Sequence, residues 1–369
     1  MKILVTGSNG FLGKNLISEL ENQGYQNIYC FDKNTDKKFL EGYAKDCDFV
    51  FHLAGVNRPR DEREFMEGNF GFTSELLDIL KAYNNTCPIM LASSIQAELD
   101  NPYGTSKKAG EDLLFAYSKE TGAKVLVYRL PNVFGKWCKP NYNSVIATFC
   151  HNVAHGLPIQ INDPNVVLKL VYIDDVVNEL IGALNGHEHR DGMFCTIPTV
   201  YNITLGEIAD LIYTFKNCRD ERSIPDMSNS LIKKLYSTYL SYLPIDQFAY
   251  GLKMNIDERG SFTEFIRTID RGQVSVNISK PGITKGNHWH HTKNEKFLVV
   301  SGMGVIRLRR IDSDEIVEYY VDGDELKVVD IPPGYTHSIE NLGDRDMVTI
   351  MWANEPFNAN NPDTYYLEV

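Results

Sequence analysis

Three histidines and one glutamate near the end of the chain have the spacing of ligands to a metal ion. The first motif, G-x5-H-x-H-x4-E-x6-G, covers residues 282–302, and the second, P-x-G-x2-H-x3-N, covers residues 332–341. Imidazole nitrogens and carboxylate oxygens together suit zinc or another divalent metal. His288 and His290 are two residues apart, so both point to the same face of a strand, whereas His291 points to the other. The two motifs therefore predict a divalent-metal site.

A glycine-rich turn near the start of the chain predicts a different chemistry, the binding of a dinucleotide. Gly7, Gly10 and Gly13 follow a strand-like run and open a helical one. Glycines allow a tight turn there and let backbone amides approach a pyrophosphate at the positive end of the helix. Asp32 ends the next strand, where a ribose-binding acid is expected. The carboxylate favours NAD, whereas Lys33 and two lysines beyond it could hold a 2′-phosphate, so this choice stays open.

A third group of residues combines a tyrosine and a lysine four positions apart. Asn101 can cap a helix, and Tyr103 and Lys107 then lie on one face of it. A nearby ammonium and the positive ring of the cofactor would lower the phenol pKa, so that Tyr103 can exchange a proton at neutral pH. Upstream, Ser93 and Ser94 end a strand, where a hydroxyl could hold a substrate carbonyl. The pattern predicts the reduction of a carbonyl group.

The elements that must position these residues follow two different patterns. Up to about residue 180, short apolar runs alternate with amphipathic stretches, which predicts a parallel sheet with helices on both faces. The expected strands cover residues 3–5, 28–31, 49–53, 89–92 and 125–128, and the expected helices cover residues 12–20, 73–83 and 104–117. From about residue 252, short alternating segments with frequent turns predict an all-β barrel or sandwich. We therefore expect two domains, residues 1–243 and 252–369.

The composition argues against several other functions. The chain has 369 residues, enough for two domains, and its net charge of −12 and pI near 5.3 argue against nucleic-acid binding. Its seven cysteines include no Cys-x-x-Cys pair, and its first residues carry no export signal. No run is long and apolar enough to cross a membrane. We therefore expect a cytoplasmic protein without nucleic-acid partners or a membrane span.

The first part of the chain, roughly residues 1–240, resembles the extended short-chain dehydrogenases/reductases that act on nucleotide sugars. Besides the glycine-rich turn and the Tyr-x3-Lys pair, the matching motifs are H-L-A-G at residues 52–55 and R-L-P-N-V-F-G at residues 129–135. The resemblance implies Ser94, Tyr103 and Lys107 as the catalytic set. It also implies that Ser94, Asn132 and Val133 contact the sugar nucleotide. The implied cofactor contacts, which would surround a dinucleotide, are Gly7, Asn9, Gly10, Phe11, Leu12, Gly13, Asp32, Lys33, Leu53, Ala54, Tyr103 and Lys107.

The rest of the chain, about residues 252–369, resembles the cupins, which are small β-barrels. The first cupin motif matches throughout, whereas the leading glycine of the second would fall at Leu326. The implied metal ligands are His288, His290, Glu295 and His337. The expected fold is thus an α/β, Rossmann-type, doubly wound parallel sheet followed by an all-β cupin barrel that binds zinc or another divalent metal.

The pairing of these two domains resembles a group of bifunctional enzymes of bacterial capsular polysaccharide biosynthesis. The resemblance implies that the cupin domain epimerises C3 of a UDP-2-acetamido-2,6-dideoxy-4-hexulose. The reductase domain then reduces the C4 ketone with NADPH to UDP-2-acetamido-2,6-dideoxy-L-talose, on the route to UDP-N-acetyl-L-fucosamine. The resemblance also implies a homodimer.

Residue spacing alone supports less, namely a nicotinamide-dependent carbonyl reductase joined to a metal-binding β-barrel. Two alternatives to the bifunctional enzyme follow. In one, the chain is a nucleotide-sugar 4-ketoreductase whose cupin domain has no catalytic role. In the other, it is an NADP-binding, redox-sensing module without turnover, although the presence of Tyr103 and Lys107 argues against this.

Overall fold

The computed structural model describes residues 1–268 and 270–369, which separate into two compact units. The first unit comprises residues 1–214 and 228–244, and the second comprises residues 215–227 and 245–369. The sequence predicted two domains, residues 1–243 and 252–369. Whether each of these domains folds and acts on its own stays a prediction. Each unit is described by itself below.

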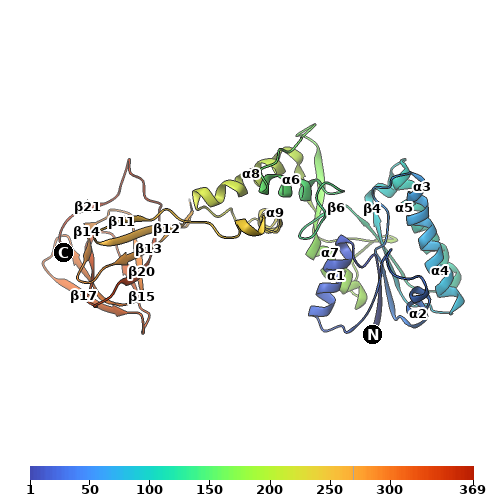
Figure 1. The fold of residues 1–369 in the computed structure, drawn as a ribbon, viewed down its shortest axis with the longest axis horizontal. Coiled ribbons are helices and arrows are strands. Elements are labelled where there is room, and N and C mark those ends of the chain that lie inside the picture. The colour runs from blue at the N-terminus through green and yellow to red at the C-terminus, as the bar shows by residue number, and fades with distance from the viewer. Residues whose placement is uncertain (269) are drawn as a thin grey trace. The chain divides into compact units, whose positions relative to one another are not determined.

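The first unit is built on a seven-stranded sheet with the order β2-β1-β3-β4-β5-β9-β8, drawn on the blue to green part of the ribbon in Figure 1. All of its neighbouring strands are parallel except β8 and β9. The strands are β1 (Lys2–Thr6), β2 (Asn27–Phe31), β3 (Phe49–His52), β4 (Ile89–Ser94), β5 (Val125–Leu130), β8 (Arg190–Asp191) and β9 (Phe194–Cys195). The predicted strands of the parallel sheet are confirmed.

Helices cover both faces of this sheet because its strands are apolar on both sides. Ile3 and Val5 of β1 belong to a core shared with α1 (Phe11–Asn22) and α7 (Ile173–Leu184). Leu4, between them, points to the opposite core. That second core is shared with α2 (Lys38–Asp46), α4 (Phe72–Ala82) and α5 (Pro102–Thr121). The predicted doubly wound arrangement is confirmed.

The strand order fixes where a ligand can bind. From β1 the chain crosses to β2 on one side and then returns to β3 on the other. The helices that follow the adjacent strands β1 and β3, α1 and α4, cover opposite faces of the sheet, and a crevice opens beyond the carboxyl ends of these two strands. The turns after these two strands approach each other closely. A Cβ on Gly7 would lie only 2.7 Å from the backbone nitrogen of Ala54, so no larger residue fits at position 7. The glycine-rich turn thus lies at the switch point of the sheet.

The remaining elements of the first unit are a small sheet and several helices. A small sheet has the order β10-β7-β6. Its strands are β6 (Asn132–Phe134), β7 (Val167–Tyr172) and β10 (Tyr201–Thr204). The further helices are α3 (Arg63–Phe65), a π-helix (Met66–Gly71), a 3₁₀-helix (Ile95–Glu98), α6 (Val145–Ala154), α9 (Ser230–Leu240) and the first part of α8 (Leu205–Glu221), whose residues from 215 on belong to the second unit. No helix in the described part of the chain combines the length and the apolar character that a membrane crossing requires.

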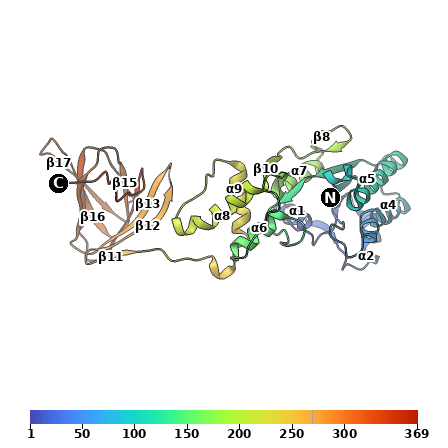
Figure 2. The ribbon, with the colours of Figure 1, turned by 90° about the horizontal axis from the view of Figure 1, so that it is seen from above.

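The second unit consists of two antiparallel sheets, seen in orange and red in Figures 1 and 2. The orders are β11-β12-β13-β20-β15-β18 and β17-β16-β19-β14-β21. The strands are β11 (Asn255–Asp257), β12 (Gly260–Thr268), β13 (Gly272–Ser279), β14 (Thr284–Trp289), β15 (Glu295–Ser301), β16 (Met303–Arg310), β17 (Ile316–Asp322), β18 (Val328–Ile331), β19 (Tyr335–Asn341), β20 (Met347–Ala353) and β21 (Tyr365–Tyr366). A short 3₁₀-helix (Ile245–Gln247) precedes them.

The two sheets share one apolar core. Phe297 and Val299 come from the six-stranded sheet, and Ile306, Leu308 and Ile339 come from the five-stranded one. Side chains that alternate toward a common interior explain the short alternating segments of the sequence. The prediction of an all-β C-terminal domain is confirmed.

Candidate active site and metal centre

A cavity of about 1030 Å³ lies in the first unit, beyond the carboxyl ends of β1, β3 and β4. It is large enough for a dinucleotide and part of a second ligand. Every residue that the sequence predicted for the cofactor, the substrate and the catalytic step lines it, namely Gly7, Asn9, Gly10, Phe11, Leu12, Gly13, Asp32, Lys33, Leu53, Ala54, Ser94, Tyr103, Lys107, Asn132 and Val133. The structure thus brings these residues together, and their individual roles stay predictions.

The glycine-rich turn has a geometry that larger residues could not adopt. Gly7 has φ +70°, and a Cβ on Gly13 would lie 2.3 Å from the carbonyl oxygen of Gly7. Gly10 precedes the first residue of α1 and provides no side-chain cap for the first turn of that helix. The residues of that turn line the cavity, and the amides at the start of a helix are suited to a phosphate group.

Asp32 stands directly after β2 at the rim of the cavity. One of its carboxylate oxygens accepts a hydrogen bond from the amide of Asn9, at 3.1 Å, which ties it to the glycine-rich turn. Lys33 also lines the cavity, and within the described residues it has no ion-pair partner. Lys37 instead pairs with Glu75 at 2.8 Å. Lys33 is therefore the better placed of these lysines to meet a negatively charged group in the cavity.

Helix α5 carries the tyrosine and the lysine, as its sequence predicts. The side chain of Asn101 accepts a hydrogen bond from the amide of Gly104 at 2.8 Å and so caps the helix. The ammonium of Lys107 lies 6.0 Å from the ring centre of Tyr103 and donates to the carbonyl oxygen of Ala92 at 3.0 Å. Burial lowers the pKa of Lys107 to about 8. This ammonium is thus held rigidly, and its charge is sensitive to pH near neutrality.

The pKa of Tyr103 differs in direction from the sequence-based expectation. Burial of the phenol raises its pKa, and the hydroxyl of Ser94 opposes this rise. The expected lowering by the ammonium of Lys107 is not found among the groups of the protein itself, because burial of the phenol dominates. The ammonium lies 6.0 Å from the ring centre of Tyr103 and donates to Ala92 instead. Tyr103 therefore holds its proton at neutral pH.

The two serines at the end of β4 have different partners. The hydroxyl of Ser93 donates to the buried carboxylate of Glu111 at 2.5 Å. Arg129 binds the same carboxylate through two nitrogens, the shorter contact being 2.6 Å. The Ser94 hydroxyl accepts from the amide of Gln96, at 3.2 Å, and lines the cavity beside Tyr103. Of the two serines, Ser94 is thus the one whose hydroxyl is not held by a buried carboxylate and is better placed to meet a carbonyl group in the cavity.

Glu111 and Arg129 support the site, a role that the sequence did not reveal for either residue, although Arg129 belongs to one of the matching motifs. Glu111 lies on α5 one turn after Lys107, so the two side chains share a face of the helix. Arg129 opens the R-L-P-N-V-F-G motif on β5. A buried carboxylate with an arginine partner fixes the ends of β4 and β5 relative to α5. The spacing of four residues between Lys107 and Glu111 is the sequence signal that could have revealed the role of Glu111.

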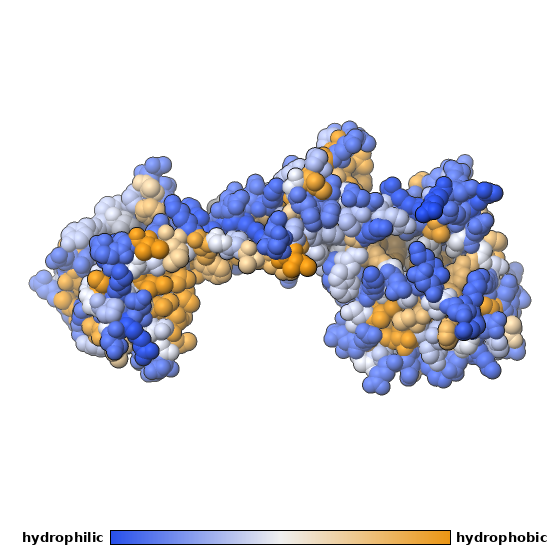
Figure 3. All heavy atoms as spheres, viewed as in Figure 1, coloured by the Kyte–Doolittle hydropathy of each residue, from blue (hydrophilic) through white to orange (hydrophobic). Residues whose placement is uncertain are grey.

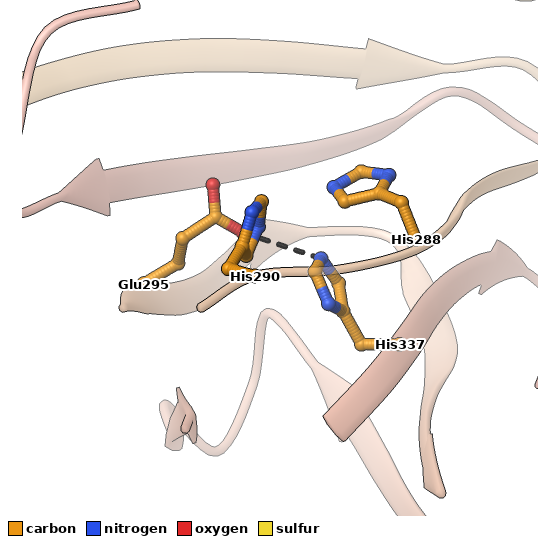
Figure 4. A group of neighbouring side chains, drawn as sticks. All are labelled: His288, His290, Glu295 and His337. Carbon is orange, nitrogen blue, oxygen red and sulfur yellow. Dashed lines mark ion pairs between the residues drawn. The ribbon is translucent and has the colours of Figure 1, made fainter. Parts of the chain in front are cut away.

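The second unit brings the four predicted metal ligands together, as Figure 4 shows. One ligand atom from each of His288, His290, Glu295 and His337 lies within 4.8 Å of the others. The carboxylate of Glu295 is 3.2 Å from His337 Nε2 and 3.5 Å from His290 Nε2. His291, by contrast, packs against Trp289 and Tyr365 outside this cluster. The predicted division between ligands and His291 agrees with these positions.

A bulge in β14 contributes to this convergence. The register of β14 with β19 shifts between Gly286 and His288, and Asn287 there has φ +59°. A bulge re-aims the side chains that follow it. His288 is paired with His337 across the two strands, and their ring centres are 4.5 Å apart. The bulge thus sets the two imidazoles side by side.

Several polar atoms of the cluster lack hydrogen-bond partners. Nε2 of His290, Oε2 of Glu295 and both ring nitrogens of His337 are buried without one in the described structure. Glu295 is within ion-pair distance of two of these rings, but the geometry is not that of a hydrogen bond. Buried polar atoms are costly unless something binds them. The donor set and its lack of partners fit a divalent cation.

The protonation states of the cluster also suit a cation. Burial lowers the pKa of His288 to about 4, so its ring is neutral and has a free lone pair at neutral pH. Burial raises the pKa of Glu295, but contacts with His290 and His337 outweigh this and hold it well below its usual range. A neutral imidazole and an ionised carboxylate are the forms that bind metals.

Two family models match this chain. The model described as "NAD dependent epimerase/dehydratase family" matches residues 3–203, and the model described as "Polysaccharide biosynthesis C-terminal domain" matches residues 255–365. The chain belongs to the NAD-dependent epimerase/dehydratase family. The first match includes the turn after β1, the Tyr103–Lys107 pair and Asn132, and the second includes all four residues of the metal cluster.

Individual members of the family are similar over the whole chain. A UDP-2-acetamido-2,6-beta-L-arabino-hexul-4-ose reductase from Pseudomonas aeruginosa is 43% identical over 369 residues, covering 100% of this chain and 99% of that protein. The crystal structure of the capsular polysaccharide assembling protein CapF from Staphylococcus aureus is 58% identical, with a TM-score of 0.96 and complete coverage of both chains. The resemblance to capsule biosynthesis enzymes that the sequence predicted is thus confirmed.

A more distant relative shares the fold of the first unit. The UDP-glucose 4-epimerase of Thermus thermophilus, solved in complex with NAD, is 23% identical with a TM-score of 0.52. It covers 59% of this chain, and the match covers 84% of that protein. The likeness shows that a Rossmann-like, doubly wound sheet underlies both proteins.

Proposed function

We propose that this protein completes two steps on one nucleotide sugar. The C-terminal domain, as a cupin barrel, epimerises C3 of a UDP-2-acetamido-2,6-dideoxy-4-hexulose. The N-terminal domain then reduces the C4 ketone with NADPH to UDP-2-acetamido-2,6-dideoxy-L-talose, on the route to UDP-N-acetyl-L-fucosamine. The observation that carries the proposal is the convergence of Ser94, Tyr103 and Lys107 in one cavity with the glycine-rich turn. The printed name of the Pseudomonas aeruginosa relative supports the substrate class.

The reduction assigns one role to each of three side chains. A bound dihydronicotinamide supplies a hydride for C4, and the oxygen on C4 must then receive a proton. Tyr103 donates that proton, since burial raises its pKa and keeps it protonated at neutral pH. Ser94 donates a hydrogen bond to the same oxygen and orients the ketone. Lys107, whose charge is present below its pKa of about 8, stabilises the tyrosinate that remains.

NADPH is the proposed reductant because a lysine lies beside Asp32 at the rim of the cavity. Lys33 faces the cavity without an ion-pair partner among the described residues, so it is available for a ribose 2′-phosphate. The carboxylate of Asp32 accepts a hydrogen bond from the amide of Asn9, so it points toward the glycine-rich turn. A carboxylate at this position also suits a ribose hydroxyl of NAD, and the measurement of both cofactors decides between them.

The proposed role of the metal cluster is the C3 epimerisation. His288, His290, Glu295 and His337 would hold zinc or another divalent cation. When bound, such a cation supplies Lewis acidity for a ketone whose neighbouring C–H bond is broken. The four side chains would fix its place, because one ligand atom from each lies within 4.8 Å of the others. Those of His290, Glu295 and His337 are also buried without hydrogen-bond partners.

We also infer a homodimer in the cytoplasm. Figure 3 shows hydrophobic side chains gathered on part of the C-terminal unit. Strand register places Val276, Ile350, Leu298 and Val328 in one row across four strands, and Ile350 and Val328 are exposed. An exposed apolar row of this kind is typical of a protein interface. Light scattering after size-exclusion chromatography tests the dimer, and the seven free cysteines are in line with a reducing compartment.

One experiment tests both steps. The protein is incubated in D₂O with a UDP-2-acetamido-4-keto-6-deoxy sugar, with and without NADPH, and the products are identified by NMR. We expect deuterium at C3 in both reactions and the 4-hydroxy product only with NADPH.

The same experiment separates the alternatives. Reduction without any change at C3 would support a simple 4-ketoreductase with a non-catalytic C-terminal domain. Deletion of residues 252–369 should then leave the product unchanged. Binding of NADPH without any consumption of it would support the redox-sensing module and refute the proposed enzyme.

A further inference from the structure

We propose that Asp363 is a positioning residue for the metal cluster. It lies on the C-terminal segment just before β21, outside both metal-ligand motifs, and it holds the loop that runs from His290 to Glu295. The inference rests on the proposed metal site, but it concerns a residue that neither cupin motif contains.

The carboxylate of Asp363 binds the backbone of this loop at consecutive positions. It accepts hydrogen bonds from the amides of His291, Thr292 and Lys293 at 2.9, 2.7 and 2.8 Å, and from the Thr292 hydroxyl at 3.1 Å. Three amides that converge on one carboxylate fix the conformation of a loop as a helix cap fixes a first turn. The spacing between His290 and Glu295 is thus held from outside the loop.

The main chain of Asp363 acts on His290 directly. Its carbonyl oxygen lies within hydrogen-bond distance of Nδ1 of His290. A carbonyl can only accept, so Nδ1 must carry the proton, and the lone pair is then on Nε2. Nε2 is the atom that lies 3.5 Å from the Glu295 carboxylate and has no hydrogen-bond partner. This is the arrangement in which a histidine ligand is oriented through its second nitrogen.

The rest of the C-terminal segment binds the strand that carries His288. Tyr366 pairs with His288 and Tyr365 pairs with Trp289 where β21 meets β14. The ring of Tyr365 also lies 5.0 Å from that of Trp289, on the outer side of the strand. The amide of Leu367 donates to the carbonyl of Asn287, the residue in the bulge, at 3.0 Å. Asp363 and β21 therefore fix both ends of the His288–His290 segment.

The test compares metal binding in matched variants of the full-length chain. Asp363→Ala removes the carboxylate, and Asp363→Asn keeps one acceptor oxygen. The control is Asp322→Ala, because Asp322 also accepts two backbone amides at a turn of the same unit, those of Asp324 and Glu325 at 2.9 and 2.8 Å. Zinc affinity is measured by competition with a chelator, and the geometry of the site is read from the visible absorption of bound Co²⁺.

We expect Asp363→Ala to weaken zinc binding by about 10- to 100-fold and to change the Co²⁺ spectrum. Asp363→Asn should lie between this variant and the wild type, and Asp322→Ala should bind zinc normally. Wild-type affinity and spectrum in Asp363→Ala would overturn the inference, and so would an equal loss in Asp322→Ala. If the wild-type protein itself bound no zinc and no Co²⁺, the proposed metal site would be refuted instead, and the inference with it.

Discussion

The reductase site and the metal cluster are built on opposite principles. In the first unit, the buried polar groups around the cavity have protein partners: Lys107 donates to Ala92, and Ser93 and Arg129 share Glu111. In the second unit, the buried ligand atoms converge and have no hydrogen-bond partners. The first site is organised before any ligand binds, whereas the second would need a cation to complete it. Changes that remove a cation should therefore affect only one of the two proposed reactions.

The largest effect should come from Tyr103→Phe. This change deletes the hydroxyl that donates the proton to the oxygen on C4 and keeps the ring, which lies 5.6 Å from that of Phe65. We expect kcat for ketone reduction to fall by about 10³-fold, in the range of lost acid catalysis. The rate of NADPH oxidation, followed by absorbance, measures it.

The matched control for this change is Tyr213→Phe, because Tyr213 is an exposed residue on α8 that does not line the cavity. It should keep the wild-type rate. NADPH binding, measured by fluorescence, should be similar in both variants. A wild-type rate of ketone reduction in Tyr103→Phe would refute the assignment of Tyr103 as the proton donor.

The next largest effect should come from loss of the metal site, and it should affect the proposed epimerisation but not the proposed reduction. His337→Ala, or dialysis against a chelator, removes a ligand or the cation from the cluster around Glu295. We expect exchange of the C3 proton with solvent deuterium to fall by about 100-fold or more, because the Lewis acid is lost. Reduction of a substrate that already has the product configuration at C3 should continue at its normal rate. Persistence of the exchange after complete metal removal would show that the cation is structural.

A smaller effect is expected from the titration of Lys107. Its pKa of about 8 lies below the usual value of a lysine because it is buried. The ammonium is charged below this pH and neutral above it, so kcat/KM should fall as the pH rises, by about tenfold between pH 7 and 9. Tyr103 does not cause this fall, because its own pKa is raised above the usual value of a phenol.

The pH profiles of two variants check the assignment. Lys107→Met should be slow and nearly independent of pH over this range. Lys108→Met is the control, since Lys108 is the next residue of α5 and its side chain is exposed. It should keep the wild-type profile. A fall that persists in Lys107→Met would mean that another group titrates.

The sequence predicted the elements and the groups of the sites well because their signals are local. A short apolar run defines β1, an amphipathic stretch defines α1, and the two motifs of the metal cluster lie on or next to short strands. What it missed depends on contacts between distant segments. The strand order and the role of Glu111 are of this kind, and so is Asp363, which reaches the loop after His290 from far along the chain.

The direction of the Tyr103 pKa was wrong for a related reason. Spacing on a helix tells which side chains share a face, but not how deeply they are buried or where an ammonium turns. Burial governs both Tyr103 and Lys107, and Lys107 is directed to Ala92. Depth is a property of the packed domain, so it could not be derived from the spacing of two residues.

The smallest effect should come from Lys33, and it concerns the choice between NADPH and NADH at the reductase site. Lys33→Ala removes the free ammonium at the rim of the cavity. A solvent-exposed charge pair is worth up to about 1 kcal/mol, so the KM for NADPH should rise by about fivefold while that for NADH stays unchanged. Lys37→Ala is the control, because Lys37 is already paired with Glu75 at 2.8 Å. Equal changes for both cofactors in Lys33→Ala would mean that Lys33 does not meet a 2′-phosphate. Asp32, bound to the amide of Asn9, would then be the residue that selects the cofactor, in favour of NADH.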